Sequence, residues 1–133
     1  EQYAKDNNLE ILGRIVSTSV QGCKADTMGL GPIGATKKAL ARAKLSIKDI
    51  DIVELNEAFA SQSLACIKDL QIDPKKVNLD GGALALGHPL GATGARITGK
   101  VAQLLKRENK KYALASQCIG LGMGIATIIE SVD

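Results

Sequence analysis

The sequence predicts an α/β fold in which helices pack on one mixed, mainly parallel sheet of five strands. Strand-like and helix-like segments alternate along the 133 residues, which is typical of this class. Hydrophobic residues make up 45% of the chain, enough for one core. Aromatic residues make up only 2%, so the core is expected to consist of Ala, Val, Ile and Leu. We therefore expect a single domain over residues 1–133.

The first half of the chain is predicted to contain two strands and two helices. Ile, Val, Ser and Thr dominate Ile11–Val20, which is typical of a strand. The apolar positions of Ala35–Lys44 fall on one face of a helix. Asp51–Leu55 is a short apolar strand, and Ala58–Leu70 is a second helix that ends before Pro74.

The second half is predicted to add a third helix and three strands. Val77–Leu86 is an apolar strand that runs into glycines, and Gly91–Arg107 carries a helical apolar face. Tyr112–Ile119 and Ile125–Val132 form a hairpin around a glycine-rich turn. The βαβαβαββ order favours right-handed parallel crossovers and one final antiparallel strand. Three helices in one layer would leave a face of the sheet for another domain or subunit to cover.

Composition disfavours several classes of partner. The formal net charge is +3, the basic residues are scattered and stacking aromatics are scarce, which disfavours nucleic acid. No apolar run is long enough to span a bilayer. Cys23, Cys66 and Cys118 form no Cys-x-x-Cys pair, and only His88 is available to join them, so no metal site is predicted. An odd number of cysteines favours a reducing, cytoplasmic location.

Three polar or nucleophilic side chains follow predicted strands. Asn56 comes after Asp51–Leu55, His88 after Val77–Leu86, and Cys118 lies at the end of the penultimate strand. Ligands in open α/β sheets bind beyond the carboxyl ends of the strands, so we expect these side chains to share one cavity. An amide, an imidazole and a thiol supply a hydrogen-bond donor, a general base, and an acid or nucleophile.

Each of these residues also has a structural interpretation. Asn56 precedes a helix, where an amide side chain commonly caps the first free backbone N–H groups. A single histidine such as His88 is often a structural residue, although Gly87 and Pro89 on either side indicate a fixed turn. Cys118 is ordinarily a small buried hydrophobe, but the glycines after it would let backbone N–H groups approach an oxyanion.

The segment Gly29–Gly34 matches the dinucleotide-binding pattern Gly-x-Gly-x-x-Gly and precedes a helix. The match is weak, because Pro32 lacks the amide N–H that a phosphate cradle uses. In addition, Cys23–Met28 separates the glycines from the preceding strand, so the tight turn that this pattern needs is missing. We therefore do not predict nucleotide binding.

The strand-end segments resemble the C-terminal signatures of thiolases. Asn56–Ala60 (Asn-Glu-Ala-Phe-Ala), Gly81–Arg96 and Cys118–Gly120 match them in order and at similar spacing, and Met28–Leu40 is also similar to the family. The resemblance covers nearly the whole chain. It implies one half of the thiolase pair of βαβαβαββ domains, from an acetyl-CoA C-acetyltransferase of fatty acid metabolism. Such an enzyme makes or cleaves acetoacetyl-CoA or another 3-ketoacyl-CoA, is a homo-oligomer, and needs no cofactor because coenzyme A is part of its substrate.

The resemblance also implies roles for individual residues. His88 matches the histidine that activates the nucleophilic cysteine and binds the thioester oxygen of the enolate. Cys118 matches the cysteine that moves the C2 proton of acetyl-CoA, Asn56 the asparagine that holds a water in the enolate's oxyanion hole, and the Gly120 amide a donor to the tetrahedral intermediate. Three further residues match positions that bind substrate along the pantetheine and acyl tunnel: Phe59, Ala58 and Met28.

Two departures from the family pattern matter. Leu121 stands where thiolases usually have Gly, in the loop after Cys118. The nucleophilic cysteine belongs to the N-terminal half of thiolases, and neither Cys23 nor Cys66 has a matching context, so the chain alone is expected to be inactive. Two alternatives remain open: a non-catalytic interaction domain, and a relative of thiolase fold such as a β-ketoacyl synthase, which commonly presents two histidines.

Overall fold

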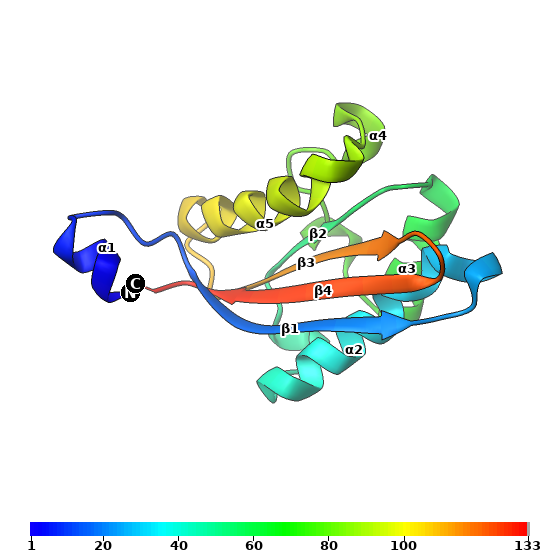
Figure 1. Ribbon diagram of the computed structural model, residues 1–133, viewed down its shortest axis with the longest axis horizontal. Coiled ribbons are helices and arrows are strands. Elements are labelled where there is room, and N and C mark those ends of the chain that lie inside the picture. The colour runs from blue at the N-terminus through cyan, green and yellow to red at the C-terminus, as the bar shows by residue number, and fades with distance from the viewer. Residues whose placement is uncertain (133) are drawn as a thin grey trace.

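In the computed structural model, which describes residues 1–132, a four-stranded mixed sheet lies at the centre of the molecule (Figure 1). The strands are β1 (Arg14–Gly22), β2 (Ile52–Leu55), β3 (Tyr112–Ile119) and β4 (Met123–Glu130), in the order β1-β4-β3-β2. The pair β2 and β3 is parallel, whereas β4 runs antiparallel to both β1 and β3. The prediction of an α/β fold is therefore confirmed.

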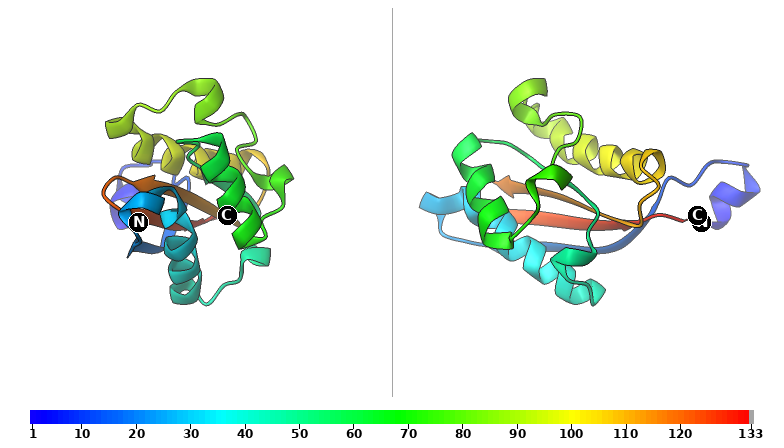
Figure 2. Two further views of the ribbon diagram at one scale, coloured as in Figure 1. Left: turned by 90° about the vertical axis from the view of Figure 1, so that its right-hand side faces the viewer. Right: turned by 180° about the vertical axis from the view of Figure 1, so that it is seen from behind.

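Helices cover both faces of this sheet, so the prediction that one face would be left for another domain or subunit is wrong. The helices α2 (Gly31–Ala43) and α3 (Ala60–Leu70) share a core cluster on one face, and α5 (Leu90–Arg107) packs on the other (Figures 1 and 2). A short helix, α4 (Ala83–Leu86), precedes α5, and α1 (Gln2–Asp6) lies apart at one end of the molecule. Three 3₁₀ turns complete the described elements: Ala25–Leu30, Ile47–Asp49 and Pro74–Lys76.

Two buried clusters form the core because strand residues alternate between the faces. On β2, Val53 belongs to the cluster with α2 and α3, whereas its neighbour Ile52 belongs to the cluster beneath α5. Ala35, Ala39 and Ala126 are fully buried where α2 crosses the sheet. The cluster beneath α5 comprises Ile52, Ile97, Val101, Leu104, Leu105, Ala113, Ala115 and Ile129. The expected Ala, Val, Ile and Leu core is confirmed.

The prediction of a fifth strand over Val77–Leu86 is wrong. Val77 makes only an isolated parallel bridge to Val53, and the backbone then turns, with φ +49° at Asn78 and +89° at Gly81. Ala83–Leu86 contains only Ala and Leu, which are strong helix formers, and it forms α4. The run was apolar but had no β-branched residues after Val77, so hydrophobicity alone misled the prediction.

The prediction of a mainly parallel sheet is also wrong. Only one of the three strand pairings is parallel, and β4 lies inside the sheet between β1 and β3. The order of elements along the chain does not reveal where β1 inserts. Here it pairs with β4 in an antiparallel ladder that runs from Arg14 opposite Glu130 to Gly22 opposite Met123.

The glycine pattern before α2 serves packing. A Cβ atom at Gly31 would lie 2.3 Å from the carbonyl oxygen of Met123, and one at Gly124 would lie 2.1 Å from the carbonyl carbon of Gly31. Helix α2 therefore starts in direct backbone contact with β4, which only glycine on both sides allows. This contact explains why Gly31 is present in the dinucleotide-like pattern, and no bound phosphate is needed to explain it.

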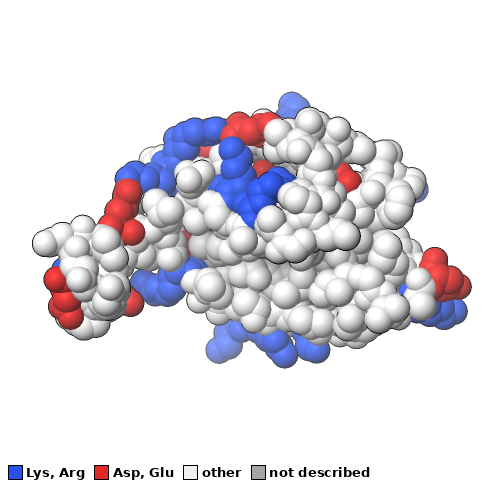
Figure 3. Space-filling model, turned by 45° about the horizontal axis from the view of Figure 1, so that its top comes forward, with Lys and Arg blue, Asp and Glu red and all other residues white. Residues whose placement is uncertain are grey.

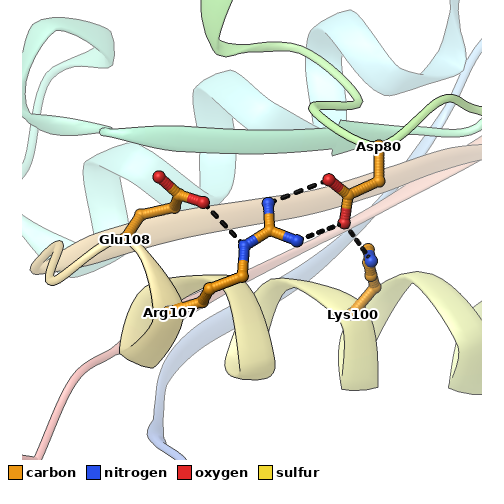
Figure 4. A network of polar contacts seen from close by, with 4 residues as sticks. All are labelled: Asp80, Lys100, Arg107 and Glu108. Atoms are coloured by element: carbon orange, nitrogen blue, oxygen red, sulfur yellow. Dashed lines mark hydrogen bonds and ion pairs between the residues drawn. The ribbon is translucent and has the colours of Figure 1, made fainter.

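An ionic cluster joins the turn after Val77 to α5. Arg107 donates two hydrogen bonds to Asp80, at 2.6 and 2.8 Å, and Lys100 pairs with the same carboxylate (Figure 4). Glu108 accepts a hydrogen bond from Arg107 Nε at 2.7 Å. In Figure 3, basic side chains gathered over α5 lie next to acidic ones. The hydrogen bonds from Arg107 and Lys100 hold the pKa of Asp80 well below its usual range.

Candidate active site

The carboxyl ends of β2 and β3 bring two of the predicted residues to one edge of the sheet. The two strands are parallel with Leu55 opposite Ser116, and the backbone N–H of Asn56 donates to the carbonyl of Ser116 at 2.9 Å. Cys118 lies two residues further along β3. Asn56 and Cys118 therefore leave neighbouring strands at the same end, as predicted.

His88 reaches the same edge from a different element. It follows α4 rather than a strand, and Gly87 before it has φ +93°, a conformation that glycine adopts freely. The imidazole Nε2 of His88 lies 3.3 Å from Nδ2 of Asn56, and Nδ1 lies 2.7 Å from Oγ1 of Thr93. The predicted juxtaposition of the amide and the imidazole is present, although the predicted strand before His88 is not.

The contacts of His88 assign its tautomer. The hydroxyl of Thr93 donates to the carbonyl oxygen of Pro89 at 3.3 Å, so its oxygen accepts from Nδ1–H of His88. Nε2 of the neutral ring then carries the lone pair and accepts from Nδ2 of Asn56. The ring therefore presents its basic nitrogen on the Asn56 side.

Asn56 does not cap the helix that follows. The α3 helix begins at Ala60 with Phe59 in the cap position, so the capping interpretation of Asn56 is wrong. The side chain of Asn56 is fully buried, and its Oδ1 accepts no hydrogen bond from the described residues. Buried polar atoms normally have a partner, so this unpaired oxygen, on the same amide whose Nδ2 contacts His88, is available to a bound molecule.

A cavity of about 360 Å³ brings the other predicted residues together. Its lining comprises Met28, Ala58, Phe59, His88, Leu90, Gln117, Cys118, Ile119 and Gly120. Every site residue predicted from the sequence lines it except Asn56, which adjoins it through His88. A larger hollow of about 760 Å³ lies between residues 1–15 and α5, but no thiol or imidazole lines it. The smaller cavity is therefore the candidate site.

The sequence prediction missed several members of this site. Gln117 and Leu90 line the cavity, and Thr93 orients His88. Gln117 had a detectable signal, because it is a large polar residue near the end of a mostly apolar strand. Thr93 had none beyond its nearness in sequence to His88.

Cys118 lies in the wall of the cavity, whereas Cys66 lies in the core. Cys118 is half-buried in the cavity wall, and burial raises the pKa of its thiol above the usual 9.0. Cys118 is therefore a neutral thiol at pH 7, able to donate a proton. Cys66 is fully buried in the core and donates to the carbonyl oxygen of Gly29 at 3.5 Å, so it is a packing residue.

The backbone of the loop after Cys118 is unfavourable for a leucine at position 121. Leu121 has φ +69° and a side chain that is 93% exposed, next to Gly122 with φ +93°. A positive φ favours glycine, which is the residue that thiolases usually carry there. Leu121 therefore keeps the turn but in a strained conformation, while the backbone of Gly120 stays open to the cavity.

Residues 1–132 lack two further features. Among them, no group of three or more His, Cys, Asp or Glu side chains is placed to hold a metal ion. None of the helices in this part of the chain is long and apolar enough to cross a membrane.

Known proteins are similar to the chain along almost its whole length. The family model described as "Thiolase, C-terminal domain" matches residues 9–131. A 3-ketoacyl-CoA thiolase of Shewanella frigidimarina is 54% identical over 135 residues, covering 99% of this chain and 35% of that protein. A 3-ketoacyl-CoA thiolase of Vibrio parahaemolyticus is 53% identical over 133 residues, covering 98% and 34%. The chain thus spans about a third of the length of these relatives.

Solved structures agree with these sequence matches. The crystal structure of human mitochondrial 3-ketoacyl-CoA thiolase matches with a TM-score of 0.96 and 50% identity, covering 100% of this chain and 34% of that one, and a complex of that enzyme with CoA matches equally. Acetyl-CoA acetyltransferase of Bacillus anthracis matches with a TM-score of 0.95 and 45% identity, covering 99% and 34%. By its fold, its cavity and these matches, the chain belongs to the thiolase family, as a C-terminal domain.

Proposed function

We propose that the chain is the C-terminal catalytic part of an acetyl-CoA C-acetyltransferase that makes or cleaves acetoacetyl-CoA or another 3-ketoacyl-CoA. One observation carries the proposal: the cavity is lined by the Cys118 thiol and by an imidazole whose Nε2 lies 3.3 Å from the Asn56 amide. The names of the relatives support the same reaction class. The CoA complex of the human enzyme supports a CoA thioester as the substrate.

The geometry suits His88 to accept a proton from a nucleophilic thiol. Thr93 accepts from Nδ1–H, so Nε2, which the Asn56 amide contacts, is the ring nitrogen that can act as the base. After it takes a proton, the ring becomes an imidazolium and Nε2–H becomes a donor. That donor can stabilise the negative charge that develops on a thioester oxygen in the cavity.

Cys118 suits the exchange of the C2 proton. A cysteine thiol is ordinarily protonated at neutral pH, and burial raises the pKa of Cys118 further, so in the cleavage direction it can protonate the departing acetyl-CoA carbanion. The resulting thiolate is the base for the reverse, condensing direction. The C2 proton of a thioester is weakly acidic, so this step requires donors at the enolate oxygen, for which His88 and Asn56 are placed.

The acyl-accepting nucleophile is expected from outside the chain. Neither Cys23 nor Cys66 lines the cavity, and Cys66 is enclosed in the core. At the cavity, the side chains of Phe59 and Leu90 are 59% and 81% exposed. Large apolar surfaces of this kind favour a protein partner, and the N-terminal thiolase half would both cover them and bring the missing cysteine.

Thiolysis assays test the proposal directly. The 133-residue chain, incubated with acetoacetyl-CoA and CoA, is expected to release no acetyl-CoA. Adding the N-terminal half, as a separate polypeptide or in one continuous chain, is expected to give turnover that His88→Ala and Cys118→Ala abolish. Turnover by the chain alone would contradict the inferred source of the nucleophile, and unchanged turnover in the Cys118→Ala variant would contradict the role of that thiol.

The wider setting is also part of this proposal. We place the complete protein in fatty acid metabolism, in the cytoplasm and in a homo-oligomer, with no cofactor beyond the CoA of its substrate. The family resemblance supports the assembly and the metabolic role. The free thiols Cys23, Cys66 and Cys118 suit a reducing compartment.

A further inference from the structure

Glu57, the residue after Asn56, joins two segments that are distant from it in the sequence. Its Oε1 accepts a hydrogen bond from Nδ2 of Asn78 at 3.1 Å. Its Oε2 accepts one from the backbone N–H of Leu84 at 2.9 Å. The carboxylate is half-buried, and each of its two oxygens accepts a hydrogen bond, so it is held in one position.

Asn78 anchors this carboxylate to the sheet. Its Oδ1 accepts from the N–H of Leu55 and its Nδ2 donates to the carbonyl of Leu55, both at 3.0 Å. The side chain thus pairs with the end of β2 much as a neighbouring strand would. Gly82 packs against the same pair, since a Cβ atom there would lie 2.4 Å from both Asn78 Nδ2 and Glu57 Oε2.

The other end of the connection leads to His88. Leu84 is the second residue of α4, and its N–H is one of the groups that the first turn of a helix leaves without a partner. Glu57 supplies that partner, and a negative charge is favourable at a helix N-terminus. Helix α4 closes with the N–H of Gly87 on the carbonyl of Ala83 at 2.8 Å, directly before His88.

Asn56 and Glu57, which are adjacent in the sequence, therefore hold His88 in two different ways. Asn56 touches the imidazole itself, whereas Glu57 holds the short helix from which the imidazole extends. We propose that Glu57 is a positioning residue for His88, fixing α4 relative to the end of β2 and so setting the Asn56 to His88 distance. Its effect on turnover rests on the proposed function, but its effect on α4 does not.

Hydrogen exchange measured by mass spectrometry tests the effect on α4. In a polypeptide that carries both thiolase halves, Glu57→Gln is expected to speed exchange at residues 84–87 by about tenfold or more, with little change elsewhere. A merely destabilised protein would instead exchange faster throughout. The matched control is Glu130→Gln, because Glu130 also accepts a side-chain hydrogen bond, from Tyr112, but lies at the opposite end of the sheet.

Kinetics test the effect on chemistry. A displaced imidazole is expected to lower kcat for thiolysis about tenfold to a hundredfold while KM stays within about twofold. A second variant, Leu84→Pro, removes the N–H that Glu57 binds and leaves the carboxylate, at a first-turn position where proline is tolerated. It is expected to reproduce both effects, and it carries the test if Glu57→Gln does not fold.

The outcomes separate this inference from the proposed function. Normal exchange at residues 84–87 in a folded Glu57→Gln variant, or at residues 85–87 in a folded Leu84→Pro variant, overturns the positioning role. Faster local exchange with unchanged kcat also overturns it, because α4 would then not set the working geometry of His88. Absence of thiolysis in the unsubstituted two-half protein contradicts the proposed function alone, and the exchange measurement still decides the role of Glu57.

Discussion

Nδ1 of His88 lies 2.7 Å from Oγ1 of Thr93, whose hydroxyl in turn reaches back to the carbonyl of Pro89. Thr93 is fully buried near the start of α5, so this contact ties the imidazole to the helix rather than to the sheet. With Asn56 on the other ring nitrogen, contacts on both sides fix the plane of the ring, and the donation from Thr93 to Pro89 favours the tautomer with Nδ1–H.

Thr93→Val is expected to impair both stability and turnover. Valine has the shape of threonine but leaves Nδ1–H of His88 without an acceptor, which costs about 1–3 kcal/mol of unfolding free energy. In a polypeptide with both thiolase halves, a ring free to change tautomer is expected to lower kcat about tenfold or more. Urea unfolding and thiolysis assays measure the two effects.

The matched control for this variant lies on the same helix. Thr98→Val makes the same substitution five residues further along α5, at a half-buried position that lines the larger hollow and not the site cavity. It is expected to leave kcat unchanged. Equal kcat values for the two variants would show that Thr93 does not orient His88.

Sequence periodicity was sufficient for most elements of the fold. The apolar faces at Ala35–Lys44 and Gly91–Arg107 correspond to α2 and α5 within a few residues, and the final hairpin was also predicted. Periodicity failed at Val77–Leu86, which has neither a strand nor a long-helix pattern. There the backbone follows from tertiary contacts of Asn78 and Glu57 that no local pattern reveals.

The candidate site, like the fold, was predictable from the sequence only in part. Asn56 and Cys118 were predictable because parallel strands end at a common edge. His88 was placed correctly for a wrong reason, since a helix and a turn, not a strand, carry it there. Thr93 and Glu57 were missed because their roles depend on partners that the fold brings close.

Leu121→Gly is expected to stabilise the chain. Leu121 has φ +69°, which costs a side-chain-bearing residue about 1–2 kcal/mol relative to glycine, and its exposed side chain contributes little packing. The greater freedom of glycine in the unfolded chain offsets part of this gain, so a net increase of about 0.5–1 kcal/mol is expected. Urea unfolding measures it, and a loss of stability would show that Leu121 makes a favourable contact. Leu64→Gly is the control: this exposed leucine lies inside α3, where glycine is expected to destabilise.

Glu54 is expected to make stability fall as pH rises. Its side chain is 1% exposed on β2, and burial raises its pKa from 4.5 to about 7, with Arg96 and Lys100 partly opposing the shift. The folded chain therefore holds this proton more tightly than the unfolded chain does. The unfolding free energy should decline between pH 4.5 and about 7, by about 3 kcal/mol in total, and level off above that. Glu54→Gln should remove this decline in unfolding free energy. If the unfolding free energies of the wild type and of Glu54→Gln changed in parallel with pH, the role of Glu54 would be contradicted.

Asp80→Asn is expected to loosen α5 with the opposite pH dependence. Arg107 and Lys100 hold the pKa of Asp80 well below its usual value of 3.8, so the folded chain favours the carboxylate (Figure 4). This stabilisation is fully present above pH 3.8 and is lost as the pH falls below it. The wild-type chain should therefore melt at a higher temperature than Asp80→Asn at pH 7, and the difference should shrink as the pH falls below 3.8 and as salt is added.

Asp69→Asn, which breaks the single exposed pair with Lys37, is the control and should have a smaller effect. Equal melting temperatures for Asp80→Asn and the wild type at pH 7 would show that the cluster does not hold α5.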